Sequence, residues 1–238
     1  MVYQPYILLT VATIDNVTVK AYVFPEHTEL SIPFLQTTTS ALRTYGRLFG
    51  PYGHPQLTIV EGEFADGLEY DGLYYLGEEY FDDYTGDPMS YLVALAAHET
   101  AHQWWSAKVG SDPAYNPWLD EALATYSELL FYERAYPEIS DRWWDFRVRR
   151  YDPQGQVGGS VYDFPVFRSY VNAVYLRGAE FLGEVASRCG ESAVVSALVS
   201  YEWAYTGKLG DPAGLLNMLA GSCDESLDDL VSSYFGPA

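Results

Sequence analysis

Four residues near the middle of the chain have the types and spacing of a catalytic metal site. His98 and His102 stand four positions apart with Glu99 between them, and Glu121 follows after eighteen intervening residues. Side chains four apart on a helix lie on one face, so both imidazoles can reach a single ion. Two histidines, one carboxylate and a position left for water are typical of catalytic zinc. Glu99 is then placed to act as a base on the metal-activated water.

The alternative interpretation of this motif is a surface helix that carries two unrelated histidines. The chain has only four histidines in 238 residues, and two of them form this pair. Asp87-Pro88 predicts a helix start, apolar residues then recur at helical spacing up to His98, and Gly110 predicts the end. A regular helix under the pair favours the metal site.

Glu121 lies in the first turn of a second predicted helix. Asn116-Pro117 is typical of a helix start, and residues 118 to about 136 have helical periodicity. This helix can pack antiparallel to the first through a connection of about ten residues. A first-turn carboxylate is also favoured by the helix dipole alone, and we assign that simpler role to Asp120.

Two blocks around these residues resemble the zinc-binding blocks of the aminopeptidase N family of gluzincin peptidases. They are residues 97–105 (AHETAHQWW) and 118–124 (WLDEALA), and the gap between the histidine pair and the glutamate also matches the family pattern. The resemblance implies a zinc peptidase that hydrolyses peptides, with the cleft of a thermolysin-like catalytic domain.

The resemblance also implies the role of each residue at the metal. One Zn²⁺ per chain would be held by His98, His102 and Glu121, and Glu99 would be the general base. Glu128, two helical turns after Glu121, is a candidate to orient a zinc-bound imidazole, with a solvated helix carboxylate as the alternative.

Two further blocks are similar to substrate-binding segments of the family. Residues 174–180 (VYLRGAE) resemble its Tyr-x-Lys-Gly-Ala segment, so the tyrosine that stabilises the transition state would be Tyr175, and Arg177 stands at the lysine position. Residues 67–70 (GLEY) resemble its Gly-x-Met-Glu-Asn exopeptidase motif more loosely. Glu69 would then bind the free α-amino group of the substrate. The alternative is that Glu69 is one of many surface carboxylates.

Regularities along the chain predict an α+β fold. Residues 1–86 contain β-rich runs at 7–11, 17–24, 56–60 and 73–76 and one helical stretch at 32–48, whereas residues 87–238 are overwhelmingly helical. We expect a single catalytic domain over 1–238, with a small mixed sheet in the first half, helices in the second and the cleft between them. The family's usual architecture is longer, with flanking domains on both sides.

Composition and charge exclude several other classes of protein. The formal charge is −20 and the three lysines are scattered, which argues against nucleic acid and anionic membranes as partners. No stretch approaches twenty apolar residues, so no membrane span is expected. Cys189 and Cys223 are compatible with one disulfide or with two reduced thiols. The acidic, lysine-poor composition favours an extracytoplasmic or secreted bacterial setting over a cytoplasmic one.

Three functions remain open from the sequence. An aminopeptidase is favoured; a zinc endopeptidase or oligopeptidase with an open cleft has the same chemistry; and a peptide-binding module would keep the fold without turnover. A binding module would be expected to lose the base or a ligand, yet Glu99 and all three ligand candidates are present. His27 and His54 are interpreted as structural or surface residues, and the Gly-rich stretch 152–160 as a helix connection.

Overall fold

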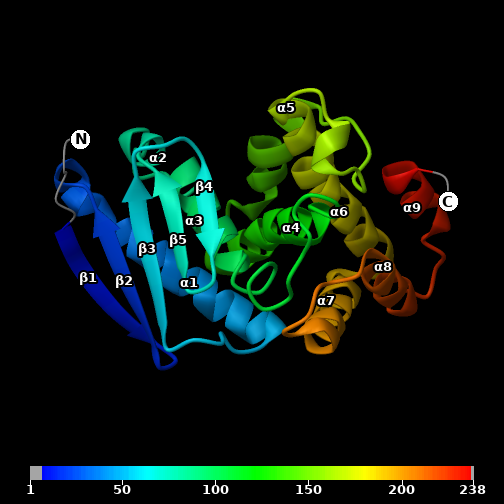
Figure 1. The fold of residues 1–238 in the computed structure, drawn as a ribbon, viewed down its shortest axis with the longest axis horizontal. Coiled ribbons are helices and arrows are strands. Elements are labelled where there is room, and N and C mark those ends of the chain that lie inside the picture. The colour runs from blue at the N-terminus through cyan, green and yellow to red at the C-terminus, as the bar shows by residue number, and fades with distance from the viewer. Residues whose placement is uncertain (1–6, 237–238) are drawn as a thin grey trace.

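The computed structural model of the chain describes residues 7–236 and begins with a five-stranded mixed sheet (Figure 1). Its strands are β1 (Ile7–Ile14), β2 (Val17–Val23), β3 (Gln56–Gly62), β4 (Gly67–Tyr70) and β5 (Leu73–Gly77). Their order across the sheet is β1-β2-β3-β5-β4. The three central strands are parallel, and each edge strand pairs antiparallel to its neighbour.

One face of the sheet is covered by α1 (Ser31–Phe49), which runs behind the strands in Figure 1. Alternate residues of β2 are buried, as expected for a strand with one face on a core. Val19, Ala21 and Val23 therefore belong to the same hydrophobic core as Phe34 and Leu42 of α1. The opposite edge strand, β4, is short and largely open to solvent on one face, and it lies beside the helical half.

The second half of the chain is helical. A short helix, α2 (Glu79–Asp82), precedes it, and its own main helices are α3 (Tyr91–Ala101), α4 (Trp118–Ala135), α5 (Phe167–Tyr170), α6 (Arg177–Cys189), α7 (Glu191–Tyr205), α8 (Pro212–Gly221) and α9 (Asp228–Phe235). Helix α3 packs between α1 and α4, and α4 also packs on α6. The ligand-bearing helices thus lie at the junction of the two halves, and the predicted α+β fold is confirmed.

The predicted bounds of the first ligand-bearing helix were wrong at both ends. Helix α3 begins at Tyr91 rather than at Asp87-Pro88, because the Asp87 carboxylate accepts a hydrogen bond from the Met89 amide at 2.9 Å and holds a turn there. The helix ends at Ala101 rather than near Gly110. Trp104 and the residue after it are fully buried, and packing both indoles into the core turns the chain away from the helix axis.

Other predicted elements are close to those observed. All four predicted strands are present, whereas β4 was not predicted as a strand. A disulfide joins Cys189, at the end of α6, to Cys223, which follows α8, so the structure selects the first of the two states left open for the cysteines. Within residues 7–236, no helix combines the length and apolar character needed to cross a bilayer.

Candidate active site and metal centre

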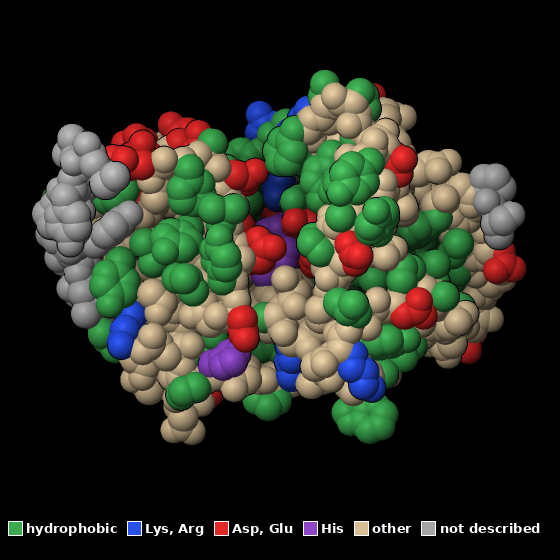
Figure 2. Space-filling view, viewed as in Figure 1, with side chains coloured by type: hydrophobic (Ala, Val, Ile, Leu, Met, Phe, Trp, Pro, Cys, Tyr) green, Lys and Arg blue, Asp and Glu red, His purple; other side chains and the backbone are tan. Residues whose placement is uncertain are grey.

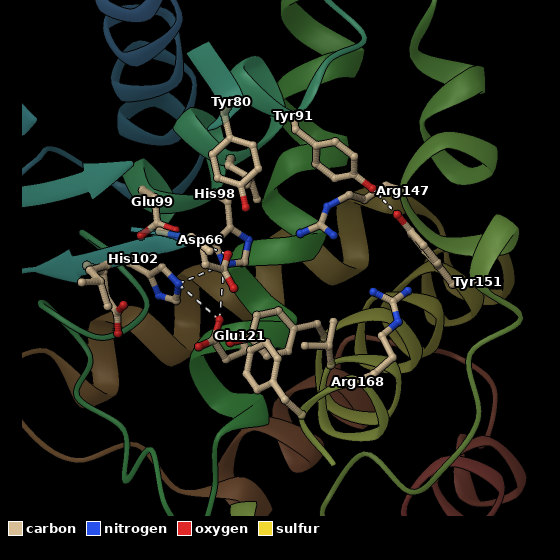
Figure 3. Close-up of a pocket in the computed structure, with 18 residues that line it drawn as sticks. Asp66, Tyr80, Tyr91, His98, Glu99, His102, Glu121, Arg147, Tyr151 and Arg168 are labelled. Atoms are coloured by element: carbon tan, nitrogen blue, oxygen red, sulfur yellow. Dashed lines mark hydrogen bonds and ion pairs between the residues drawn. The ribbon is translucent and has the colours of Figure 1, made fainter. Parts of the chain in front are cut away.

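The two histidines and Glu121 converge on one point between α3 and α4 (Figure 3). His98 Nε2 lies 3.1 Å from His102 Nε2, and Glu121 Oε2 lies 3.3 Å from the first nitrogen and 3.4 Å from the second. Both imidazoles are buried, and the carboxylate is partly buried. The predicted ligand set is therefore assembled as one cluster.

The Nδ1 atoms of both histidine rings have hydrogen-bond partners, and these partners determine the state of the Nε2 atoms that face the cluster. His98 Nδ1 lies 2.9 Å from Glu128 Oε1, and His102 Nδ1 lies 2.9 Å from the Trp105 carbonyl oxygen. Since these partners are acceptors, each Nδ1 donates and each Nε2 presents a lone pair. Two ring nitrogens and a carboxylate facing one another favour positive charge between them, which a metal ion can supply.

The spacing of this cluster fits zinc. Ligands about 2.0–2.1 Å from a tetrahedral Zn²⁺ lie about 3.3 Å from one another, close to the three separations observed here. The charges agree with this interpretation. Burial alone would lower the pKa of His98, but the Glu121 and Glu128 carboxylates outweigh it and raise that pKa to about 9. The surroundings therefore favour positive charge at the inner face of the ring.

Glu128 holds His98 in place from behind. It is fully buried on α4 and accepts hydrogen bonds from Arg147 Nε at 2.8 Å and Nη2 at 3.0 Å, besides its contact with the imidazole. Burial raises the pKa of the Glu128 carboxyl, but Arg147 and His98 outweigh this and leave it lowered. An ionised Glu128 fixes the orientation of His98, which is the geometry expected of an orienting carboxylate.

Glu99 is buried beside the cluster and faces the edge strand β4. Its Oε2 has no hydrogen-bond partner among the described residues, and a Cβ added at Gly67 would overlap its Oε1. Burial raises the pKa of Glu99 to about 8, although both histidines oppose the shift. A carboxylate with a raised pKa and a free oxygen can take up a proton and give it back, as a general acid–base group must.

Glu69 and Tyr175 approach the cluster from two different elements. Glu69 of β4, Glu99 and His102 have ligand atoms within 4.8 Å of one another. Tyr175 belongs to η6 (Val171–Leu176), a π-helical stretch, and its ring stacks on His98 at 6.0 Å and 5°. Burial, with Glu121 nearby, raises the pKa of Tyr175 well above its usual value, so the phenol keeps its proton and remains a donor.

These six residues line one cleft of about 740 Å³ between the two halves of the molecule. Figure 2 shows this hollow, with histidine at its floor and carboxylates at its edge. The sequence missed the opposite end of the cleft, where the lining residues are Tyr91, Arg147, Tyr151, Phe167 and Arg168. Arg147 could have been predicted only if the burial of Glu128 had been known, because a buried carboxylate needs a cationic partner.

Several other residues singled out in the sequence lie elsewhere. Arg177 lines a separate cavity and stacks over the Tyr234 ring at 4.6 Å, so it does not reach the metal cluster. His27 contacts Glu61 and Asp82, and His54 pairs with Asp71 at the surface, as expected for structural or surface residues. Within residues 152–160 no side chain lines the main cleft.

A mixed sheet followed by helices, with two histidines and a glutamate around one point, is the arrangement of a thermolysin-like zinc peptidase domain. Sequence comparison identifies the group within that class. Residues 35–234 match the model of the peptidase family M1 domain. The chain therefore belongs to peptidase family M1, and the resemblance found in its motifs is confirmed.

Relatives and solved structures agree with this assignment. Aminopeptidase N of Lactobacillus delbrueckii subsp. lactis is 28% identical over 247 residues, which cover 95% of this chain and 29% of that protein. Endoplasmic reticulum aminopeptidase 2 of Bos taurus is 31% identical over 132 residues, or 52% of this chain and 14% of that protein. The M1 zinc metallopeptidase of Deinococcus radiodurans has the same fold, with a TM-score of 0.68 at 22% identity; the match covers 98% of this chain and 51% of that one. The chain thus spans less than a third of the curated relatives' length.

Proposed function

We propose that this chain is a zinc aminopeptidase, which releases the N-terminal residue of a peptide. The observation that carries the proposal is the position of Glu69, whose carboxylate lies within 4.8 Å of ligand atoms of Glu99 and His102. A carboxylate so close to the metal cluster can pair with a substrate ammonium. Peptide binding in that position leaves only the first peptide bond within reach of the ion.

The proposed zinc ligands are His98, His102 and Glu121, with one ion per chain. When bound, zinc would polarise the scissile carbonyl and lower the pKa of a coordinated water from 15.7 towards about 7. The remaining chemistry belongs to the chain. Glu99 accepts the proton of the attacking water on its free oxygen and passes it to the leaving amine.

Tyr175 is the proposed donor to the oxyanion. Its phenol remains protonated next to the ligand cluster, and its ring is held parallel to His98. A donor aimed at the developing negative charge stabilises the transition state more than the ground state. We also propose that residues 1–238 act as one catalytic domain, with this cleft between residues 1–86 and 87–238.

An extracytoplasmic setting is proposed as well. It is supported by the disulfide between Cys189 and Cys223, because disulfides persist mainly in oxidising compartments. The acidic and lysine-poor composition agrees with it. Thiol labelling of protein isolated from its native host under alkylating conditions would test this setting, and two free thiols would contradict it.

The function is tested with a fluorogenic leucyl or alanyl amide, both free and N-acetylated, on zinc-loaded protein. We expect cleavage of the free form only, loss of cleavage in Glu99→Gln, and a raised KM in Glu69→Gln. Glu63→Gln is the matched control, because Glu63 is an exposed carboxylate close to Glu69 in the sequence and does not line the cleft.

The other outcomes identify the alternatives. Equal cleavage of the acetylated substrate would show an endopeptidase or oligopeptidase with the same zinc chemistry. If zinc binds and neither substrate is cleaved, the catalytic proposal is wrong for this chain, which is then a peptide-binding module or a fragment that lacks parts needed for turnover.

A further inference from the structure

The main cleft has two ends of opposite charge. Glu99 and His102 lie at one end in Figure 3, with Glu69 close to both, and the guanidinium groups of Arg147 and Arg168 lie at the other. The chain carries a formal charge of −20 and only thirteen basic residues. Two arginines in the active-site cleft of so acidic a protein indicate a binding preference for negative charge there.

Arg147 is the fixed member of this pair. It is buried on η3 (Trp144–Val148), a second π-helical stretch, and its Nε and Nη2 are held by Glu128. No hydrogen bond from its Nη1 is recorded within residues 7–236, although the residue lines the cleft. Arg147 therefore contributes a rigid donor, while Glu128 neutralises most of its charge.

Arg168 is the available member. It is exposed on α5, it lines the cleft, and its Cζ lies 3.9 Å from the centre of the Tyr151 ring. The Tyr151 hydroxyl is in turn hydrogen-bonded to that of Tyr91 on α3. No carboxylate within the described part of the chain pairs with Arg168. Stacking thus orients a guanidinium whose donors remain open to a ligand.

The direction of the bound peptide follows from the proposed function. With its amino group at Glu69 and its first carbonyl at the ligand cluster, the peptide must continue away from β4. The cleft continues in that direction towards Tyr151 and Arg168 (Figure 3). The part of the substrate after the scissile bond therefore meets the basic end.

We propose that Arg168, supported by Arg147, forms a carboxylate subsite for the residue that follows the scissile bond. The substrates are then short peptides with a carboxylate at that position, either the C-terminus of a dipeptide or an acidic side chain. Arginine suits this role because its planar donors match a carboxylate in two parallel hydrogen bonds. The inference rests on the proposed aminopeptidase function for the direction of the peptide.

Binding of uncleavable ligands tests the subsite separately from turnover. The probes are leucyl-alanine with a reduced peptide bond, as the free acid and as the C-terminal amide, titrated calorimetrically into zinc-loaded protein. We expect the acid to bind about tenfold or more tightly than the amide, as for a hydrogen-bonded charge pair. Arg168→Gln should abolish this preference and leave amide binding unchanged.

Arg150→Gln is the matched control. Arg150 is exposed, and its Cζ lies 5.4 Å from the centre of the same Tyr151 ring, but it does not line the cleft. The variant removes the same charge from the same neighbourhood and should retain the preference for the acid. An equal loss in both variants would overturn the subsite, because the effect would then be one of overall charge.

A second ligand pair separates the two sources of the carboxylate. Reduced leucyl-aspartate amide and leucyl-asparagine amide differ only in the side-chain charge. A preference for aspartate assigns the subsite to acidic side chains, and a preference confined to the free C-terminus assigns it to dipeptides. If neither pair shows a preference in the unmodified protein, the proposal is wrong. If the preference is present but leucyl-alanine itself is not hydrolysed, Arg168 still binds a carboxylate, but the aminopeptidase function and the assignment to the residue after the scissile bond both fall.

Discussion

The proposed metal ligands and the substrate-facing residues of the cleft are built in different ways. The ligands belong to two regular helices, with His98 on α3, His102 directly after its last residue and Glu121 on α4. Of the substrate-facing residues, Glu69 comes from the edge strand β4, Tyr175 and Arg147 come from the π-helical stretches η6 and η3, and Arg168 comes from the single turn α5. The chemistry of the ion is thus fixed by regular structure, and contact with the substrate is made by irregular structure.

This difference separates two kinds of experimental effect. A change of a proposed ligand should lower the zinc content, because only three side chains hold the ion. A change of a substrate-facing residue should alter the kinetics and leave the zinc in place. Measuring zinc and turnover on the same variants therefore tests whether the two sets of residues act independently.

The largest effect is expected from removal of a ligand. His102→Ala should lose stoichiometric zinc and reduce turnover by at least about 10³-fold, since the ion supplies several kcal/mol of transition-state stabilisation. Zinc is measured by elemental analysis after dialysis. His54→Ala is the control, because His54 lies at the surface and should change neither quantity. A zinc-replete, active His102→Ala protein would refute the assigned ligand set.

Tyr175→Phe should separate substrate contact from metal binding most clearly. We expect kcat to fall by about 10²–10³-fold through loss of one oxyanion donor, with zinc content unchanged. Tyr162→Phe is the control, because this tyrosine is 73% exposed and does not line the cleft. A fall in zinc content instead would show that the stacking of Tyr175 on His98 supports the metal and not the substrate.

Gly67→Ala tests the contact between the edge strand β4 and the proposed base, Glu99. The added Cβ would overlap Glu99 Oε1, so the base must move, and small displacements of a catalytic group cost up to about 10²-fold in rate. Zinc content should be unchanged. Gly46→Ala is the control, because a Cβ at that position of α1 meets nothing within 4 Å. Full activity of Gly67→Ala would contradict the placement of Glu99 as the base.

The smallest effect is expected from loss of the carboxylate that orients His98. Glu128→Gln should weaken zinc affinity by about 10- to 100-fold, as is typical when an orienting carboxylate is lost. Competition with a chelator measures the affinity. Glu133→Gln on the same helix is the matched variant, because its carboxylate pairs with Arg134 away from the cluster. Equal affinities would mean that packing alone orients His98.

The same contrast explains what could be predicted from the sequence. The cluster was predictable because spacing within and between helices brings His98, His102 and Glu121 together without knowledge of the rest of the fold. Glu128 was predictable as a neighbour on the same helix face. The individual strands were predicted, but their order in the sheet was not. Parallel pairing of β2, β3 and β5 depends on long connections, which leave no local signal in the sequence.

A physical reason explains why the basic end of the cleft, with Arg147 and Arg168, could not be predicted. Arg168 approaches the cleft through a helix whose periodicity is broken in η6, and Arg147 through another break in η3. A period of 3.6 residues assigns side chains to the wrong face beyond such a break. The end of α3 was missed because two buried tryptophans, a tertiary effect, override the local preference for a longer helix.

The π-helical stretch η6 also bears on how such a cleft can change during evolution. Residues 167–189 form one helical run in which η6 joins α5 to α6, and a π-helical turn contains one residue more than an α-helical turn. Deletion of a single residue there would restore an unbroken α-helix and rotate everything before it by about 100° relative to α6. Tyr170 and Arg168 would turn to new directions while the packing of α6 on α4 stayed as it is. One codon gained or lost in this stretch is therefore a short genetic route to a new substrate preference that leaves the metal ligands untouched.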